Sequence, residues 1–152
     1  MDQKTQLIVI DTDIFIRDLR YPRDRESKTN RRFLDVVRTR GNAATTIVNL
    51  LEICGILSFN LSPVQLKELF FYFPRRYQVD VLPLHSLEEP LPEIEIGDLF
   101  ERIGTKFSFG DALIASMIEK FIPGADLFVS WNAKHFQQMR IPSLTPPQFL
   151  SR

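Results

Sequence analysis

The sequence has little of what several large classes of protein require. It contains one cysteine, Cys54, among 152 residues, which excludes a disulfide-rich scaffold and a cysteine-rich zinc module. Acidic residues break its apolar runs well short of the roughly 20 residues that a membrane-spanning helix needs. The polar start MDQKTQ has no apolar core of a signal peptide. We therefore expect a cytoplasmic protein that does not associate with a membrane.

The chain also lacks net charge, since 19 basic residues balance 19 acidic ones, and this argues against a protein that coats nucleic acid. The charges are nevertheless segregated along the chain. Basic residues predominate from Arg17 to Arg40, whereas the stretch from Ser86 to Glu101 carries six acidic residues and no lysine or arginine. Such segregation is typical of two solvated faces, and the alternative is that the basic segment contacts a phosphate backbone.

Apolar patterning predicts strands that alternate with helices along the whole chain. The predicted strands cover residues 7–10, 44–48, 78–84, 125–130 and 141–144. The predicted helices cover residues 14–16, 31–40, 50–59, 62–74, 96–103, 108–121 and 132–139, with Gly41 as a cap and Pro74 as a stop signal. This alternation predicts an α/β fold, a single domain over residues 1–152, with a mostly parallel sheet covered by helices on both faces.

Three acidic residues lie inside the most apolar stretches. Asp11 follows the predicted strand LIVI, Glu52 lies within IVNLLEICGIL, and Asp111 opens DALIASMI. Each also fits a helix cap when taken alone, Glu52 through an Asn49-x-x-Glu52 capping box and Asp111 through Ser108. Because ligands of open parallel sheets bind beyond the carboxyl ends of the strands, the three carboxylates are predicted to converge there.

Carboxylates gathered in apolar surroundings need a cation. With one cysteine and two histidines in the chain, oxygen ligands favour Mg²⁺ or Mn²⁺ over zinc. Such an ion polarises a phosphoryl oxygen and activates water, which is what phosphodiester hydrolysis requires. The residues therefore favour a metal-dependent phosphodiesterase with Asp11, Glu52 and Asp111 as its metal ligands.

The sequence resembles the PIN-domain nucleases, and among them the VapC-type toxins. The matching blocks are VIDTDIFI, TTIVNLLEICGIL, FSFGDALIAS, VSWNAKHF and the ending IPSLTPPQFL. This resemblance implies a three-layer α/β/α fold with about five mostly parallel strands, and Mg²⁺- or Mn²⁺-dependent endoribonuclease activity on an RNA substrate. It also implies a homodimer and an antitoxin partner.

By the same resemblance, Asp11, Glu52 and Asp111 match the family's metal ligands. The fourth acid of the family is replaced by Asn132, followed by His135, which puts a second metal ion in doubt. We expect Asn132 to assist catalysis or to cap the short helix, and His135 to be a surface or packing residue. Asp13 is interpreted as a support for the ligands.

Two other functions fit parts of the sequence. Ile10-Asp11-Thr12-Asp13 resembles the nucleophile motif of haloacid-dehalogenase-type phosphatases, but Phe15 and Ala115 stand where that motif requires other residues. The second alternative is a catalytically weak or inactive PIN domain that binds RNA or protein, and the missing fourth acid favours it. The segment Phe70–Tyr77 mixes aromatic residues with arginine, which fits base stacking, a core or a dimer interface.

Overall fold

The fold is built on a sheet of five parallel strands. The computed structural model describes residues 5–152, and its strands are β1 (Ile8–Ile10), β2 (Ala43–Thr46), β3 (Val79–Leu82), β4 (Leu127–Val129) and β5 (Ser143–Leu144). They are arranged in the order β3-β2-β1-β4-β5, with β1 at the centre, where Ile8 pairs with Ala43 of β2 and with Leu127 of β4. The expected α/β fold class is confirmed.

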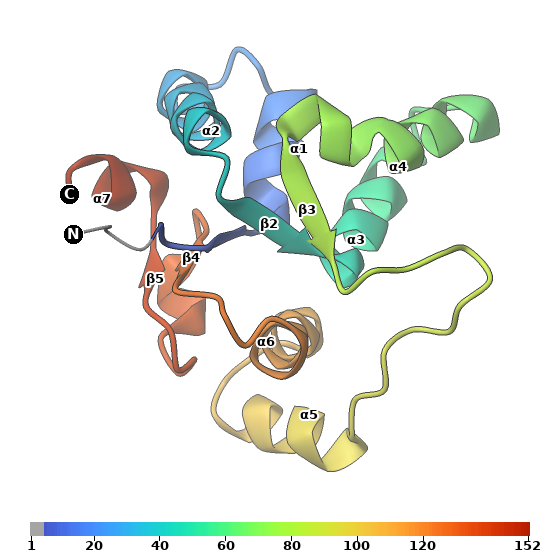
Figure 1. The fold of residues 1–152 in the computed structure, drawn as a ribbon, viewed down its shortest axis with the longest axis vertical. Coiled ribbons are helices and arrows are strands. Elements are labelled where there is room, and N and C mark those ends of the chain that lie inside the picture. Colours follow the sequence, from blue (N-terminus) through green and yellow to red (C-terminus); the bar gives the residue numbers. More distant parts are fainter. Residues whose placement is uncertain (1–4) are drawn as a thin grey trace.

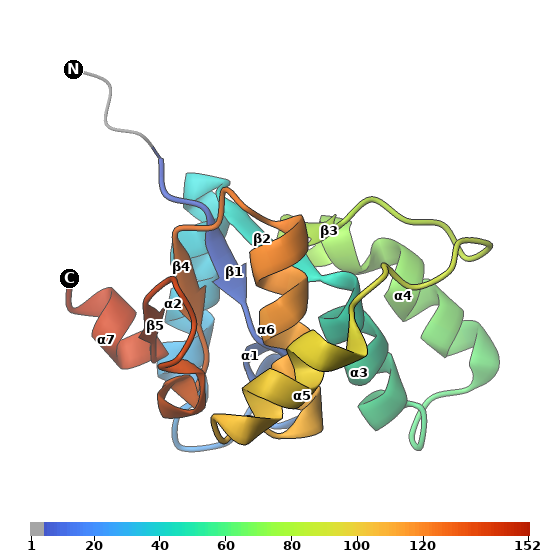
Figure 2. The ribbon, with the colours of Figure 1, turned by 90° about the horizontal axis from the view of Figure 1, so that it is seen from below.

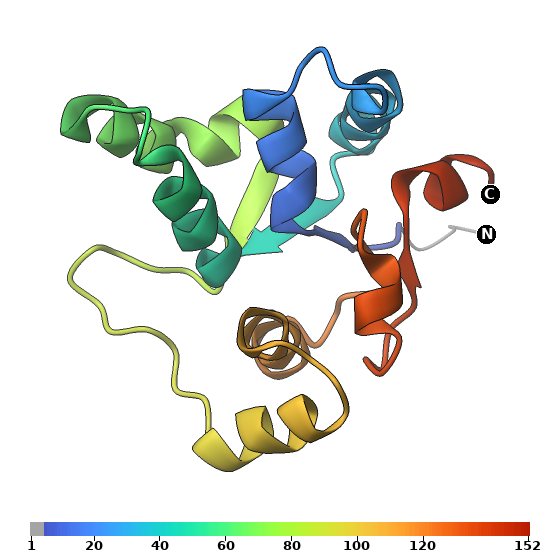
Figure 3. The same cartoon turned by 180° about the vertical axis from the view of Figure 1, so that it is seen from behind.

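Helices cover both faces of this sheet (Figures 1 and 3). On one side lie α1 (Thr12–Arg20), α2 (Ser27–Arg40), α3 (Ile47–Leu57) and α4 (Pro63–Tyr77). On the other lie α6 (Phe109–Phe121) and, outside it, α5 (Ile96–Gly104). A short 3₁₀ helix, η1 (Ala133–Phe136), follows β4, and α7 (Pro146–Leu150) packs beside α2. Within residues 5–152, every helix is too short or too polar to cross a membrane.

The side chains of β1 alternate between two buried clusters, which is why this strand reads as a continuous apolar run. Ile8 and Ile10 pack with residues of α1 to α4, whereas Val9 packs with residues of α6 and η1. All three are fully buried. The central strand is therefore held on both faces, and the residue that follows it, Asp11, is fixed in position at the edge of the sheet.

Pro74 is a predicted stop signal, but helix α4 continues past it to Tyr77. Its last turn buries Phe73 and Tyr77, whose rings lie 4.8 and 4.9 Å from the ring of Phe15. Burial of two aromatic side chains, at about 1.5–3 kcal/mol each, offsets the roughly 3 kcal/mol that an interior proline costs. Phe73 and Tyr77 are thus core residues, while Phe71 and Tyr72 of the same segment are exposed.

Other helix boundaries also differ from expectation. Helix α1 covers Thr12–Arg20 instead of the predicted 14–16, and α2 begins at Ser27, four residues before the predicted start at residue 31. Both extensions follow from tertiary contacts, because buried Asn30 of α2 donates from its side chain to the carbonyl of Ile14 in α1 at 2.9 Å. Gly41 ends α2 in the left-handed conformation, φ 67°, as predicted.

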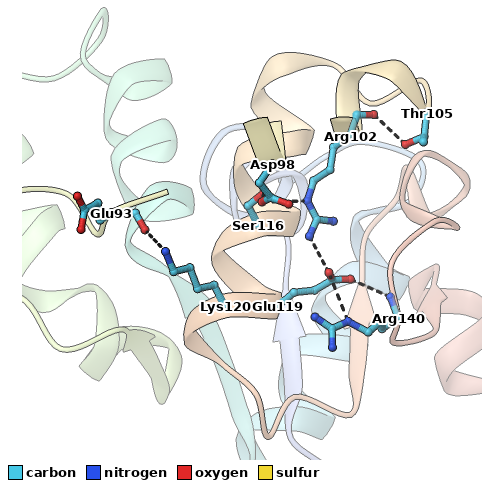
Figure 4. Close-up of polar contacts among 8 residues, drawn as sticks. All are labelled: Glu93, Asp98, Arg102, Thr105, Ser116, Glu119, Lys120 and Arg140. Carbon is cyan, nitrogen blue, oxygen red and sulfur yellow. Dashed lines mark hydrogen bonds and ion pairs between the residues drawn. The ribbon is translucent and has the colours of Figure 1, made fainter. Parts of the chain in front are cut away.

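A polar cluster fastens α5 to α6 (Figure 4). Arg102 of α5 donates to Glu119 of α6 at 2.6 Å, and the Ser116 hydroxyl donates to Asp98 at 2.5 Å. Glu119 also accepts the backbone N–H of Arg140 at 2.9 Å. No side chain of α5 is fully buried, although Leu99 packs partly buried against the core, so these polar contacts contribute to the position of α5.

Candidate active site

Segments distant in the sequence meet at the carboxyl edge of the sheet. Ile10 of β1 pairs with Val129 of β4, so the next residues, Asp11 and Ser130, are neighbours. The Asp11 backbone N–H donates to the carbonyl of Val129 at 3.0 Å. Helices α1 and α3 begin at this same edge, and α6 begins on the other side of it (Figure 2). The topology therefore brings the predicted site segments to one end of the molecule.

Asp11 is buried, with 6% of its surface exposed, and is fully hydrogen-bonded. Its Oδ1 accepts from the backbone N–H of Thr12 at 2.8 Å and from the side-chain amide of Asn49 at 3.2 Å. Its Oδ2 accepts from the hydroxyl of Ser130 at 2.7 Å. Within residues 5–152 no lysine, arginine or histidine forms an ion pair with it.

Burial is the main reason that the pKa of Asp11 is raised, to about 8. The negative charges of Asp13 and Glu52 raise this pKa further, while the hydrogen bonds from Ser130 and Thr12 lower it. The Asp11 carboxyl group therefore keeps its proton to a higher pH than an ordinary aspartate does, unless a nearby positive charge lowers its pKa. Asp11 also caps α1, as expected, so the capping role and the site role belong to the same side chain.

Asp13 lies next to Asp11 and contacts the same Ser130 hydroxyl. Its Oδ2 accepts from Ser130 at 3.1 Å and from the side-chain amide of Asn132 at 3.4 Å. Its Oδ1 is buried and has no hydrogen-bond partner among residues 5–152. Burial raises the pKa of Asp13, and the backbone N–H groups of Trp131 and Asn132, together with Ser130, act in the opposite direction.

Glu52 lies on the exposed side of α3 and is not used as a cap. The expected Asn49–Glu52 capping box is wrong, because Thr46 is the cap and Asn49 is its partner, with the Asn49 N–H donating to the Thr46 hydroxyl at 3.0 Å. The Glu52 carboxylate is close enough to raise the pKa of Asp11. Its Oε2 also lies only 3.7 Å from the position that a Cβ on Gly110 would occupy. Glu52 therefore connects the Asp11 side of the site with the start of α6.

Asp111 stands in the first turn of α6, next to Gly110. Ser108 caps this helix, as predicted, by accepting the N–H of Asp111 at 3.2 Å. The carboxylate is 27% exposed and lies 3.8 Å from Nδ1 of His135. His135 is itself 52% exposed, so it is a surface residue, as expected, but one that faces a predicted ligand.

The three predicted metal ligands are thus brought to one edge of the sheet, but not into direct contact. Glu52 influences Asp11, whereas Asp111 faces His135. In the part of the chain that the structure describes, no three histidine, cysteine or acidic side chains are close enough together to hold a metal ion as they stand. The ligand roles of Asp11, Glu52 and Asp111 remain predictions.

Asn132 occupies the cap position of η1, but its side chain makes no capping hydrogen bond, so the capping interpretation of that side chain is wrong. Its backbone N–H donates to the Ser130 hydroxyl at 3.0 Å, and its amide donates to Asp13. Asn132 is therefore part of the polar network that surrounds the two N-terminal carboxylates.

Sequence reasoning missed Ser130, the residue that connects Asp11, Asp13 and Asn132. It also gave Asn49 only a capping role, although its amide donates to Asp11 and, at 2.9 Å, to the Thr12 hydroxyl. The available signal was the first polar residue after the apolar strand LFV, since that residue stands at the carboxyl edge of a parallel sheet.

The sequence matches no protein-family model and no curated protein. Two solved structures, however, share the fold over nearly the whole chain. One is a structure of VapBC2 from Rickettsia felis bound to a DNA fragment from the promoter of VapBC2. A chain of it superposes with a TM-score of 0.61 at 16% identity, covering 92% of this chain and 98% of that one. A chain of FitAB bound to an IR36 DNA fragment gives a TM-score of 0.59 at 11% identity, covering 92% and 95%.

At these identities the similarity shows the fold. The chain has the three-layer α/β/α fold of the PIN domain, and the resemblance to VapC-type PIN domains is confirmed at that level.

Proposed function

We propose that this chain is a Mg²⁺- or Mn²⁺-dependent endoribonuclease. The observation that carries this proposal is Asp11, which is buried beside Asp13 and within the field of Glu52, with no cationic side chain paired to it in residues 5–152. An acidic group kept at this cost, at the ligand-binding edge of a parallel sheet, is characteristic of a functional site.

Carboxylate oxygens are the ligand type that a hard divalent cation prefers. Asp11, Glu52 and Asp111 are the proposed ligands. Beside Asp11, the buried Oδ1 of Asp13 accepts no hydrogen bond from residues 5–152. When bound, such an ion polarises a phosphoryl oxygen and makes water a better nucleophile. Asp11 is held in one orientation by three donors, Thr12, Asn49 and Ser130, so it is preorganised for this role.

Cleavage of single-stranded RNA in the presence of Mn²⁺ tests the proposal. Asp111→Asn is expected to reduce the rate more than about 100-fold, because even residues that only support metal ligands account for 10- to 100-fold. Asp35→Asn, at an exposed acidic residue of α2, is the matched control and should leave the rate unchanged. An Asp111→Asn variant that cleaves RNA at the wild-type rate would refute the assignment.

We further propose that the chain is the toxin of a toxin–antitoxin pair that acts in the cytoplasm. Support comes from the two similar structures, VapBC2 and FitAB, each bound to a DNA fragment. Expression of the wild-type chain should arrest bacterial growth, and Asp111→Asn should not. Co-expression of the protein encoded next to it should relieve the arrest. Growth that is unaffected by the wild-type nuclease would contradict the toxin role while leaving the enzymatic one intact.

A homodimer is the third part of this proposal, and α5 supports it. Ile96 and Phe100 of α5 are 85% and 76% exposed, and Ile103 one turn further is 41% exposed. Exposed apolar residues at helical spacing favour association with another surface. Light scattering should give twice the 17.7 kDa chain mass, and Phe100→Lys should shift it toward the monomer.

The alternative function, an inactive binding module, is favoured by one observation. The carboxylates of residues 5–152 do not stand together as a metal site, and position 132 carries a neutral amide. Calorimetric titration with Mn²⁺ separates the two functions. Binding that Asp111→Asn removes supports the nuclease, whereas no binding at millimolar Mn²⁺ supports the module.

A further inference from the structure

A polar pocket of about 200 Å³ lies between α1, α2 and α4, three helices on the same side of the sheet (Figure 3). Three arginines line it, Arg31 and Arg38 of α2 and Arg76 of α4. Arg31 and Arg38 are seven residues apart, about two helical turns, so they lie on one face of α2. Arg76 stands in the last turn of α4. The fold therefore brings basic residues that are distant in the sequence to one pocket.

The buried carboxylate of Asp18 orients one of these arginines. Its side chain is 5% exposed, and its Oδ1 lies 2.6 Å from Nη2 of Arg31. Its Oδ2 accepts from the Tyr77 hydroxyl at 2.7 Å. Burial and the hydrogen bond to Asp18 raise the pKa of Tyr77, so its hydroxyl stays protonated and remains a donor. Asp18 is thus neutralised by Arg31, which is 61% exposed and keeps its other nitrogens accessible.

The other two arginines are not neutralised. Neither Arg38 nor Arg76 forms an ion pair within residues 5–152, and both are exposed. Asp35 is the other acidic residue that lines the pocket, and its charge offsets one of the two. A single unpaired arginine is ordinary on a protein surface. Two from different helices, beside a third that is held in place, give a local excess of positive charge.

The accessible lining of the pocket is polar. Leu34 and Tyr77 also line it, but they are only 6% and 7% exposed, so a ligand would bury little apolar surface here. A phosphate group needs none, because its oxygens match the planar guanidinium of arginine, which donates two parallel hydrogen bonds. A bound peptide depends more on an apolar centre of its interface. The pocket therefore favours a phosphate over an acidic peptide.

We propose that this pocket binds a phosphate group of single-stranded RNA, away from the site of cleavage. Asp18 follows Asp11 by seven residues, which places the pocket about 10 Å along α1 from the candidate active site. An RNA strand at the carboxyl edge of the sheet is then held at a second point. The identity of the ligand as RNA rests on the proposed function, whereas the affinity of the three arginines for a phosphate does not.

A pair of double variants tests the pocket. Arg38→Gln/Arg76→Gln removes two charges from it and breaks no ion pair within residues 5–152. Arg32→Gln/Arg75→Gln is the matched control, because it removes two charges from the same two helices, at exposed positions that do not line the pocket. The comparison separates the pocket from the general positive charge of α2 and α4.

Fluorescence anisotropy with a short labelled single-stranded RNA, in EDTA so that no divalent metal is bound, is the measurement. The pocket variant should bind RNA at least about 10-fold more weakly than wild type, and the control less than about 3-fold more weakly. Between about 50 and 200 mM NaCl, the slope of log affinity against log salt should be smaller by about 0.7 in the pocket variant, the value for one phosphate of a single strand. Asp35→Asn should tighten binding, since it removes the opposing charge, and the cleavage rate at saturating RNA should stay that of wild type.

Three results would overturn the inference. The first is wild-type affinity in the pocket variant, or equal weakening in both double variants. The second is loss of labelled poly-glutamate binding in the pocket variant while RNA binding is unchanged, which would make the pocket a site for an acidic protein. The third is tighter binding of inorganic phosphate, titrated alone by calorimetry, than of RNA. If circular dichroism shows that the pocket variant does not fold, Arg38→Gln alone decides, and unchanged RNA affinity there would overturn the inference as well.

Cleavage in Mn²⁺ separates this inference from the function on which it rests. The pocket variant should have a raised KM, since the pocket holds RNA and does not touch the reacting phosphate. Cleavage with the wild-type KM would refute the pocket and retain the nuclease. A wild-type chain that binds RNA through the pocket but does not cleave it would refute the nuclease and retain the pocket. A wild-type chain that does not bind RNA would refute both.

Discussion

Replacing Asp11 with asparagine should stabilise the protein in the absence of metal. The carboxyl group has a pKa of about 8 in the folded chain, so at pH 7 it is largely protonated and neutral. An asparagine has the same shape as a protonated aspartic acid. Its side-chain oxygen can accept hydrogen bonds from Thr12 and Asn49. Its amide can donate to the Ser130 hydroxyl, which then donates its own hydrogen bond to Asp13.

The magnitude follows from the difference between the folded and unfolded pKa values. In the unfolded chain Asp11 has a pKa near 3.8, so folding at pH 7 requires it to take up a proton that it has already released. At 1.36 kcal/mol per pH unit, the roughly 3 units between 3.8 and 7 correspond to about 4 kcal/mol. The variant does not lose this free energy. We expect a gain of about 2–4 kcal/mol, the lower value applying if the amide fits the Ser130 hydroxyl less closely than the acid does.

The sign of the pH dependence is distinctive. The folded state binds more protons than the unfolded state between pH 4 and 8, so the free energy of unfolding of the wild type should fall as pH rises through this window, by up to about 1.4 kcal/mol per unit. Asp11→Asn should show a flatter profile. A gain of about 2–4 kcal/mol in the free energy of unfolding, at about 2–4 °C per kcal/mol for a chain of this length, should raise its melting temperature at pH 7 by about 4–16 °C.

Urea denaturation at several pH values, with EDTA present, checks these expectations, with Asp35→Asn as the charge-matched control. Asp35 is exposed on α2, so its variant should follow the wild-type curve. An Asp11→Asn variant that is less stable than wild type at pH 7, or that keeps the wild-type slope, would show that Asp11 is not a destabilising buried acid. Added Mn²⁺ should then stabilise the wild type and leave Asp11→Asn unchanged.

Three further substitutions probe the network and the layers around it. Ser130→Ala removes the donor shared by the two carboxylates and should lower the free energy of unfolding by about 1–3 kcal/mol in urea titrations. Burial acts to raise the pKa of Glu119, but its hydrogen bonds to Arg102 and to the Arg140 backbone outweigh it and lower that pKa. Glu119→Gln should therefore cost about 1–3 kcal/mol at pH 7 and speed hydrogen exchange in α5, with a smaller cost below pH 4. Tyr77→Phe removes only the hydroxyl that donates to the buried, ion-paired Asp18 carboxylate at 2.7 Å, so calorimetry should show a loss of about 1.5–3 kcal/mol, and a stability equal to that of wild type would contradict this account.

The sheet was predictable because the local sequence pattern alone indicates its strands. The run LIVI contains only apolar residues of the kind that both faces of a parallel strand bury, and it yields β1 to within one residue. Helix boundaries were less predictable where a distant partner decides them. Pro74 is a valid local stop signal, but the ring of Phe15, about 60 positions earlier, draws Tyr77 into the core and extends α4 past the proline.

The site was predictable to the extent that strand ends define it. Asp11 follows β1 directly, so its place at the edge of the sheet needs no tertiary information. Ser130 follows β4 in the same way. A serine at such a position is not unusual in a sequence, whereas an acidic residue in an apolar run is. Glu52 is unusual in the sequence because it is an acid in an apolar run, but its expected capping box is wrong, because Thr46 lies one turn earlier and takes Asn49 as its partner.

The composition of this corner is itself an argument about function. Every hydrogen-bond partner of Asp11 among residues 5–152 is a donor that an asparagine side chain could satisfy with at most one rotation of a hydroxyl, and asparagine would not bear the protonation cost. A residue kept only to cap α1 would therefore be better neutral. The chain instead places a second acid, Asp13, next to the same Ser130 hydroxyl, and one of its oxygens has no hydrogen-bond partner within residues 5–152. Two neighbouring carboxylates that each weaken the isolated fold make physical sense when a cation, absent from the polypeptide itself, completes the site.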